Sequence, residues 1–274
     1  MNDTPVKVGI IGAGNMGGAF AKALSQLPHV HLFIYDRNPH KTHAVAKGKE
    51  KFVVCNSPAE VAAASDLVLL SVKPQGLLET VTEITSSLTA AKVLMSIAVG
   101  VSADAIAAAT GNLCPVVRIM PNTPLLVGEG MFALVLDDPG LTFEEKEVIT
   151  NLLERMGKVY VMSEDKIDAF SAIVGSGPGF MFVLWQAFEE AAVALGFTRK
   201  EAKEMVLATA KGSALLAEST SSDLQELYEM VASPGGTTIA GAIHLDRTGT
   251  KGHIVDAITA SYSRAKELAK LQKK

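Results

Sequence analysis

The chain has 274 residues, which is enough for two domains and a large buried core. Hydrophobic residues make up 48% of it and charged residues 20%, with a formal net charge of −4, as in an ordinary soluble globular protein. Because this charge creates no basic field, the composition argues against a nucleic-acid-binding protein.

The first predicted element is an apolar, β-branched strand over residues 6–11, which runs directly into a glycine-rich turn. The turn reads Gly12-x-Gly14-x-x-Gly17, and a helical pattern follows it. Gly12 permits the tight turn, Gly14 lets the backbone approach a pyrophosphate, and Gly17 lets the helix pack closely on the strand. At a first strand–helix junction this spacing predicts a dinucleotide site, with the phosphates at the helix N-terminus.

The second predicted strand, residues 31–35, ends at Asp36-Arg37-Asn38. An acidic residue at this distance from the glycines normally accepts hydrogen bonds from the adenosine ribose hydroxyls and favours NAD. Arg37, Asn38 and Lys41 favour the opposite choice, because they could hold a 2′-phosphate. The sequence leaves this preference open.

Six further strands are expected, and they alternate with helical segments. This pattern predicts an α/β fold with a parallel, doubly wound, Rossmann-type sheet. Ligands of such sheets bind at the carboxyl ends of the strands, so we expect the loops at Asp36, Lys73-Pro74, residues 98–100 and Asn122-Thr123 to converge on one crevice. The six strands are predicted over residues 52–54, 66–72, 93–98, 116–120, 131–136 and 157–161.

Strand character disappears beyond about Met162, and helices are predicted to fill the rest of the chain. We therefore expect an NAD(P)-binding domain over residues 1–163 and an all-helical domain over residues 164–274. The helix over residues 180–195 is apolar around much of its circumference, which indicates burial on several sides. A helical domain over residues 164–274 is small for so much burial, which suggests that a partner subunit covers this helix. We therefore expect a homodimer through the helical half. The alternative is burial against neighbouring helices of the same chain.

Capping signals mark three of the predicted helix starts. They are Thr142-x-x-Glu145, Thr198-x-x-Glu201 and Ser222-x-x-Gln225. The last helix is expected from about Lys251.

Cys55 and Cys114 lie at predicted strand edges without metal or redox spacing, so we expect buried structural thiols in a reducing compartment. The histidines form no metal-ligand pattern, and no metal is expected. No signal peptide is visible. The longest charge-free stretch, residues 169–188, contains a Gly-Pro-rich run over residues 175–179 that we expect to interrupt a spanning helix. These observations favour a cytoplasmic protein.

A second glycine-rich stretch is Ser233-Pro234-Gly235-Gly236-Thr237-Thr238. Its exposed N–H groups would make a nest for a small anion such as a carboxylate. Alternatively, Thr237 or Thr238 caps the next helix. The spacing alone does not separate the two interpretations.

This stretch resembles the signature of the Δ1-pyrroline-5-carboxylate reductase family. Four other stretches are similar to motifs of the family, in the same order: residues 9–17, Val72-Lys73-Pro74, residues 120–124 and Gly175-Ser176-Gly177-Pro178. The resemblance implies reduction of the cyclic imine pyrroline-5-carboxylate to proline by hydride transfer, the last step of proline biosynthesis. It implies NADP(H) as the favoured cofactor, with NAD(H) also possible. It further implies that the helical half dimerises, with a higher oligomer of dimers possible, and that the substrate loop of one chain completes the other chain's site.

The resemblance also assigns residues. Thr238 matches the position of a hydroxyl that touches the imine nitrogen; it is too weakly acidic to protonate a free imine, so it would orient a substrate that already carries its proton. The expected substrate contacts are Glu164, Ser233, Gly235, Gly236, Thr237 and Thr238. The expected cofactor contacts, with those from the end of the second strand, are Ile11, Gly12, Ala13, Gly14, Asn15, Met16, Asp36, Arg37, Asn38, Asn56, Ser71, Val72, Lys73, Pro74, Ile97, Ala98 and Val99.

Two alternatives stay open. One is a related imine or β-hydroxyacid reductase; the hydroxyacid enzymes use a lysine on the long helix, and residues 180–195 contain none. The other is a catalytically silent nucleotide-binding relative. Tyr228-Glu229-Met230 departs from a basic or amide residue that is common in the family, and Gly179-Phe180 replaces a common Ala-Tyr pair.

Overall fold

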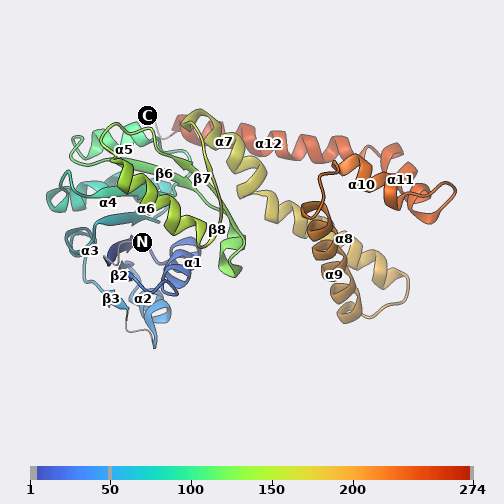
Figure 1. Cartoon of the computed structure of the whole chain (residues 1–274), viewed down its shortest axis with the longest axis horizontal. Coiled ribbons are helices and arrows are strands. Elements are labelled where there is room, and N and C mark those ends of the chain that lie inside the picture. The colour runs from blue at the N-terminus through green and yellow to red at the C-terminus, as the bar shows by residue number, and fades with distance from the viewer. Residues whose placement is uncertain (1–4, 49–50, 272–274) are drawn as a thin grey trace. The chain divides into compact units, whose positions relative to one another are not determined.

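The computed structural model describes residues 5–48 and 51–271, and within these ranges all eight expected strands are present and form one sheet (Figure 1). Their order across the sheet, β3-β2-β1-β4-β5-β6-β7-β8, confirms the doubly wound, Rossmann-type arrangement. The strands are β1 (Val6–Ile11), β2 (Val30–Tyr35), β3 (Phe52–Val54), β4 (Leu67–Leu70), β5 (Val93–Ser96), β6 (Val116–Met120), β7 (Gly130–Val135) and β8 (Gly157–Val161).

The expected parallel direction holds from β1 to β6 only. β7 is antiparallel to β6 and parallel to β8. The connection between β6 and β7 contains only the short 3₁₀ helix η3 (Thr123–Val127), which is too short to cross a face of the sheet. Helix α6 (Phe143–Glu154) does cross between β7 and β8, so these two strands are parallel again.

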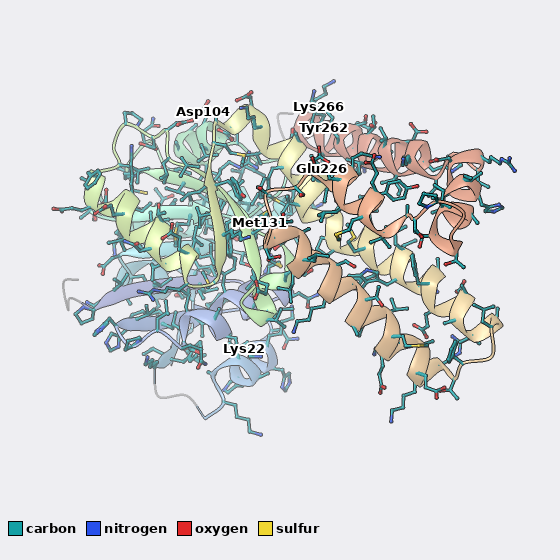
Figure 2. The ribbon with its side chains drawn as sticks, turned by 45° about the vertical axis from the view of Figure 1, so that its right-hand side comes forward. Lys22, Asp104, Met131, Glu226, Tyr262 and Lys266 are labelled. Carbon is teal, nitrogen blue, oxygen red and sulfur yellow. The ribbon has the colours of Figure 1, made fainter. Side chains whose placement is uncertain are left out.

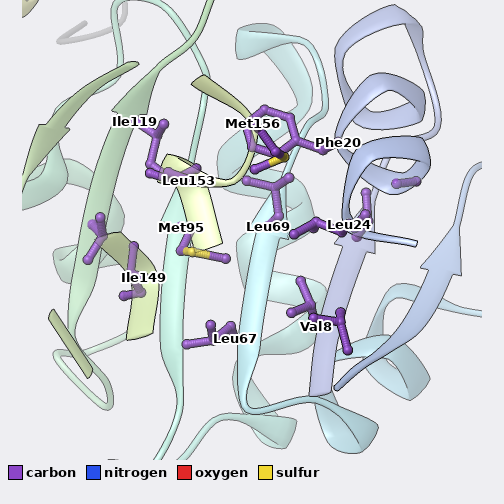
Figure 3. Packing of buried hydrophobic residues seen from close by; sticks show 14 of the residues in the cluster. Val8, Phe20, Leu24, Leu67, Leu69, Met95, Ile119, Ile149, Leu153 and Met156 are labelled. Carbon is purple, nitrogen blue, oxygen red and sulfur yellow. The ribbon is translucent and has the colours of Figure 1, made fainter. Parts of the chain in front are cut away.

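Helices cover both faces of the sheet, so its strands are apolar on both sides. On one face, Phe20 and Leu24 of α1 and Ile149 of α6 pack on Val8 and Met95 (Figure 3). Helices α3, α4 and α5 pack on the other face in a second apolar cluster. The six helices are α1 (Asn15–Leu24), α2 (Pro39–Ala46), α3 (Pro58–Ala64), α4 (Leu77–Ile84), α5 (Ala103–Ala109) and α6.

The chain forms two compact units. The sheet unit contains the chain up to Ser176 and again from Ser261 onward, and the helical unit contains residues 177–260. Ile167 and Phe170 pack on Ala133 and Val135 of β7, which places the chain after residue 163 in the sheet unit. These compact units do not test the division into domains of residues 1–163 and 164–274, which stays a prediction.

The Gly-Pro-rich run over residues 175–179 does not interrupt the helix, so that expectation was wrong. Helical structure continues from Glu164 to Ala194, through η4 (Glu164–Lys166), α7 (Ile167–Phe170), the π-helical turn η5 (Ser171–Gly175) and α8 (Gly177–Ala194). Pro178 lies in the first turn of α8, where a missing N–H breaks no hydrogen bond. Among the described residues this is the one helix that is long and apolar enough to cross a membrane by length and composition.

The helical unit consists of the helices expected from the sequence. Thr198 and Glu201 form the predicted capping box of α9. The third capping signal was misplaced by one residue, because Asp223 caps α10 and pairs with Glu226. After α8, the helices are α9 (Arg199–Glu218), α10 (Leu224–Val231), α11 (Thr237–Arg247) and α12 (Thr250–Leu271).

The apolar helix α8 contains no buried residue in the single chain. Phe182, Val183 and Phe188 are all exposed. Burial against helices of the same chain is therefore not what explains its apolar circumference, and the interpretation as a subunit interface remains.

Helix α12 begins in the helical unit and ends in the sheet unit. The Ser261 hydroxyl is 3.0 Å from that of Ser176, where the chain leaves the sheet unit. In its last turns, the ammonium of Lys266 lies 4.3 Å from the centre of the Tyr262 ring (Figure 2). Leu268 and Ala269 lie against Gly100, in the loop after β5.

Candidate functional site

The glycine-rich turn after β1 has the geometry that each predicted glycine role requires. Gly12 has φ +102°, and a Cβ there would lie 2.5 Å from the backbone oxygen of Ser71. A Cβ on Gly17 would collide with the carbonyl oxygen of Gly12, so α1 packs against the turn itself. A Cβ on Gly14 would meet no atom of the described chain within 4 Å. Gly12 and Gly17 therefore serve close packing, and Gly14 leaves space for a ligand.

The same turn offers donors for an anion. Gly14 is the N-cap of α1, so no side chain caps this helix, and its first turn contains no acidic residue. The first N–H groups of a helix have no partner inside the helix, and the helix dipole favours negative charge there. The open space at Gly14 and these N–H groups fit the pyrophosphate of a dinucleotide.

The predicted cofactor contacts lie together at one edge of the sheet. The register aligns Ile11 of β1 with Tyr35 of β2 and Leu70 of β4, and aligns Leu70 with Ser96 of β5. The loops that follow these strands therefore begin side by side, as expected for the carboxyl edge. They contain residues 12–16, 36–38, 71–74 and 97–99. Asn56 follows β3 at the same edge, and its backbone N–H and side-chain amide donate to Glu60.

Asn122 was expected to face the same crevice, but its amide is committed inside the fold. It is buried, its Oδ1 accepts from the backbone N–H of Met131, and its Nδ2 donates to the Val174 carbonyl. The turn after β6 therefore ties β7 to the π-helical turn η5.

The side chains after β2 differ in what they contact. Both oxygens of Asp36 accept backbone hydrogen bonds, from Ala13 and Asn38, and Lys41 lies 3.8 Å away. The Asn38 side chain caps α2 by accepting from His40 N–H. The Arg37 guanidinium lies against Gly76, in η1 (Pro74–Gly76), so it borders the Lys73-Pro74 corner. Each oxygen of Asp36 keeps a further lone pair, so its contact with a ribose stays a prediction.

Glu164 is held by a residue that the sequence reasoning missed. Its Oε1 accepts from Arg118 Nη1 at 2.8 Å and from the backbone N–H of Ala103 at 3.0 Å. Nη2 of Arg118 donates to the Ala98 carbonyl at 3.3 Å. Arg118 is buried in β6 among apolar neighbours. A charge inside an otherwise apolar strand was the available signal, because such a charge needs a partner.

The predicted substrate loop, residues 233–238, lies in the helical unit and leads into α11. Gly235 has φ +70°, and the backbone N–H of Gly236 donates to the Ser233 carbonyl at 3.0 Å, which closes the turn. Gly236 is the N-cap, so neither threonine caps the helix, and the capping interpretation was wrong. Both hydroxyls, of Thr237 and Thr238, are exposed and have no hydrogen bond among the residues described. The loop therefore presents free N–H groups and free hydroxyls, whereas Glu164 belongs to the sheet unit.

The environment of each thiol raises its pKa, which disfavours the reactive thiolate. Burial raises the pKa of Cys114 to about 11, and partial burial followed by the charge of Glu60 raises the pKa of Cys55. Cys55 is only half-buried, which corrects the expectation for it. No cluster of metal-ligating side chains occurs in the part of the chain that the structure describes.

Comparisons with known proteins give one family match for the helical part of the chain and another for the part that contains the glycine-rich turn. Residues 164–268 match the family model described as pyrroline-5-carboxylate reductase dimerisation, and residues 7–100 match that of the coenzyme F420-dependent NADP oxidoreductases. The pyrroline-5-carboxylate reductase of Aquifex aeolicus is 34% identical over 264 residues, 96% of this chain and 97% of that protein. The enzyme of the same name from Escherichia coli is 33% identical over 269 residues, which cover 96% of this chain and 98% of that protein.

The fold of this chain is also similar to that of a solved structure. The crystal structure of Plasmodium falciparum pyrroline carboxylate reductase with NADP bound has a TM-score of 0.87 and 27% sequence identity. It covers 96% of this chain and 98% of its own.

Proposed function

Because this chain belongs to the pyrroline-5-carboxylate reductase family, we propose that it reduces L-Δ1-pyrroline-5-carboxylate to L-proline with NAD(P)H, the last step of proline biosynthesis. The single observation that carries this proposal within the chain is the uncapped start of α11. There, the Thr237 N–H and the Thr238 hydroxyl have no hydrogen-bond partner among the described residues, and they stand at the family's substrate signature.

We propose NADP(H) as the favoured cofactor, with NAD(H) possible. When bound, it supplies the hydride for the imine carbon. The open space at Gly14 and the uncapped first turn of α1 suit its pyrophosphate. The loops after β2 and β4, with Arg37, Asn38 and the Lys73-Pro74 corner, supply its other contacts. The complete proposed set is Ile11, Gly12, Ala13, Gly14, Asn15, Met16, Asp36, Arg37, Asn38, Asn56, Ser71, Val72, Lys73, Pro74, Ile97, Ala98 and Val99.

The substrate loop orients the substrate and does not act as a general acid. Within residues 233–237, the N–H groups of Gly235 and Thr237 bind the substrate carboxylate, because those of Ser233 and Gly236 donate to carbonyls of the turn and Pro234 has none. A helix N-terminus and a glycine turn favour an anion. The Thr238 hydroxyl oxygen accepts a hydrogen bond from the protonated imine nitrogen. A hydroxyl is too weak an acid to protonate this nitrogen itself, so catalysis relies mainly on positioning. Glu164, with its second oxygen free of hydrogen bonds among the described residues, is the further substrate contact in this proposal.

The match of residues 164–268 to the family's dimerisation model supports a dimer, and we propose that the chain dimerises through its helical part. The start of that match supports our proposed division into domains of residues 1–163 and 164–274. We propose a homodimer as the basic assembly, an oligomer of dimers as a further state, and the cytoplasm as the location. No nucleic-acid or membrane partner enters this proposal.

The deciding experiment measures oxidation of NADPH, and then NADH, by the purified protein with pyrroline-5-carboxylate, together with the proline formed. We expect turnover, with Thr238→Ala lowering kcat about 100-fold, as for loss of a group that orients the reacting centre. Thr238→Ser keeps the hydroxyl and is the matched control, so it should retain most activity.

Two other outcomes are informative. If Thr238→Ala turns over as fast as the unsubstituted protein, the reductase stands and Thr238 has no role in it. If nucleotide binds and nothing turns over, the reductase proposal is wrong and the catalytically silent relative replaces it.

A further inference from the structure

The loop that follows β5 alternates buried and partly exposed residues at the carboxyl edge of the sheet. Ala98 and Gly100 are buried, whereas Ile97 and Val99 are half-buried. In the strand order, β5 follows β4, and β4 follows β1 on the side away from β2. Because the adenosine half of a dinucleotide binds between β1 and β2, its other half extends over β4 towards β5. The loop after β5 is therefore placed to meet the nicotinamide half, and it offers two partly exposed apolar side chains there.

Two hydrogen bonds within the sheet unit hold this loop at Ala98. The Ala98 N–H donates to Ser96 Oγ, and the Ala98 carbonyl accepts from Nη2 of Arg118, both at 3.3 Å. Strong hydrogen bonds of this kind measure about 2.7–3.2 Å, so both bonds at Ala98 are long. The position of the loop therefore depends on packing beyond Ala98 as well.

The last turns of α12 supply that packing at Gly100. Gly100 has φ +81°, and a Cβ there would lie 3.2 Å from the backbone of both Leu268 and Ala269. The loop backbone thus rests on the helix backbone with no side chain between them. Ala265, one helical turn before Ala269 on the same face, is only 6% exposed. A helix backbone has no alternative rotamers, so it gives the loop a rigid support.

Resting on the proposed use of a nicotinamide cofactor, we propose that the last turns of α12 position the loop that receives the nicotinamide half. Gly100 and Ala265 are positioning residues: they touch no ligand, and they hold Ile97 and Val99 in place through the contact between loop and helix. The adenosine half binds at β1 and β2 and does not depend on this contact. A side chain at Gly100 would push the loop and the helix apart.

Titration calorimetry on the full chain tests this by comparing NADPH with 2′,5′-ADP, which contains the adenosine half of NADPH and lacks nicotinamide. We expect Gly100→Ala to weaken NADPH about tenfold and to leave 2′,5′-ADP within about twofold. Gly111→Ala is the matched control and should change neither affinity. Gly111 has φ +67°, a Cβ there would meet no atom of the described chain within 4 Å, and it lies between α5 and β6. Equal losses for both ligands in Gly100→Ala would overturn the proposal.

A second variant changes the helix and leaves the loop sequence intact. Ala265→Glu places a carboxylate at a buried position of α12 and should lift the helix end from the loop. NADPH should again weaken about tenfold and 2′,5′-ADP should stay within about twofold. Ala265→Ser keeps a small side chain and should retain the affinity for NADPH. Ser263→Glu adds the same charge at an exposed position of the same helix and should change neither ligand. Unchanged NADPH binding in Ala265→Glu would overturn the proposal.

Hydrogen exchange follows the loop without any nucleotide. The Ala98 amide should exchange about tenfold faster in Ala265→Glu than in the unsubstituted protein or in Ser263→Glu. An unchanged exchange rate would overturn the positioning role. NADPH that binds every variant equally well overturns this inference alone. If NADPH does not bind the unsubstituted protein, the proposed function fails, and this inference fails with it.

Discussion

Arg118 carries a buried charge in an apolar strand, and its partners show why that charge is tolerated. Its two guanidinium nitrogens donate to Glu164 and to the Ala98 carbonyl, while Glu164 also accepts from Ala103. The pair therefore holds both ends of the loop from β5 to α5, which contains the predicted cofactor contacts over residues 97–99. A charged pair placed in this way stabilises a loop conformation as well as the fold.

Removing one side of this pair leaves the other without compensation. We expect Arg118→Met to lower the free energy of unfolding by about 2–3 kcal/mol, somewhat below the usual cost for a fully buried pair because Glu164 is 30% exposed. Urea denaturation measures this change in the free energy of unfolding. The double variant Arg118→Met/Glu164→Met should recover part of the loss. If Arg118→Met alone is as stable as the unsubstituted protein, the ion pair has no structural role.

Single residues were predictable from the sequence where local geometry decides their role. Gly12 and Gly17 make the tight turn and the close helix contact that the sequence predicts, and the approach of a pyrophosphate at Gly14 stays a prediction. The pairing of Arg118 with Glu164 was not predictable, because it depends on β6, α5 and η4 meeting in the folded sheet. The same holds for Asp36, whose partner Ala13 is brought to it by the register of β1 and β2.

The packing of α1 on β1 depends on one glycine of two adjacent ones. A Cβ on Gly17 would collide with the Gly12 carbonyl oxygen, which belongs to the backbone and has no room to move. A Cβ on Gly18 would meet its nearest atom, Cγ2 of Val45, at 3.5 Å, an ordinary contact.

The two glycines should therefore respond to alanine in opposite directions. Gly17→Ala should destabilise the protein by about 1–3 kcal/mol through overpacking. Gly18→Ala should stabilise it by about 0.5–1 kcal/mol, because alanine favours a helix interior. Chemical denaturation of both variants gives the difference. A stable Gly17→Ala variant would mean that α1 shifts freely on the sheet.

Whole elements were predicted well where the apolar pattern was long, and less well where tertiary contacts compete. The central strands have runs of apolar residues that only a sheet covered on both faces can bury, which is why they were found. The edge strands β3 and β8 are largely exposed, and they were found from their β-branched and aromatic residues. The helix through residues 175–179 was predicted to break because glycine and proline are poor helix formers. Its π-helical turn is held instead by the Ser176 N–H to Ser171 carbonyl bond and by Asn122, which donates to Val174.

The exposed apolar side of α8 allows a test of the predicted dimer interface. Phe188 is 65% exposed in the single chain, although the helix is apolar around its circumference. We expect the partner subunit to cover this side chain in the dimer, and a carboxylate in its place would then be desolvated.

We expect Phe188→Glu to weaken the dimer about 100-fold, as for the loss of a central interface contact. Sedimentation velocity at several concentrations measures the monomer fraction. Phe143→Glu is the matched control, since Phe143 is 73% exposed at the start of α6 in the sheet unit. It should leave the assembly unchanged. Dimers that persist in Phe188→Glu would place the interface elsewhere.

The chain leaves the sheet unit at Ser176 and returns to it at Ser261, and the hydroxyls of these two serines are 3.0 Å apart. In topological terms, the helical unit is an insertion into a continuous nucleotide-binding fold, with its entry and exit points touching. A short linker from Ser176 to Ser261 would close the same backbone without residues 177–260. The seam between these serines is thus a natural place for recombination, where one helical module could be exchanged for another while the nucleotide-binding fold keeps the part of α12 from Ser261 onward.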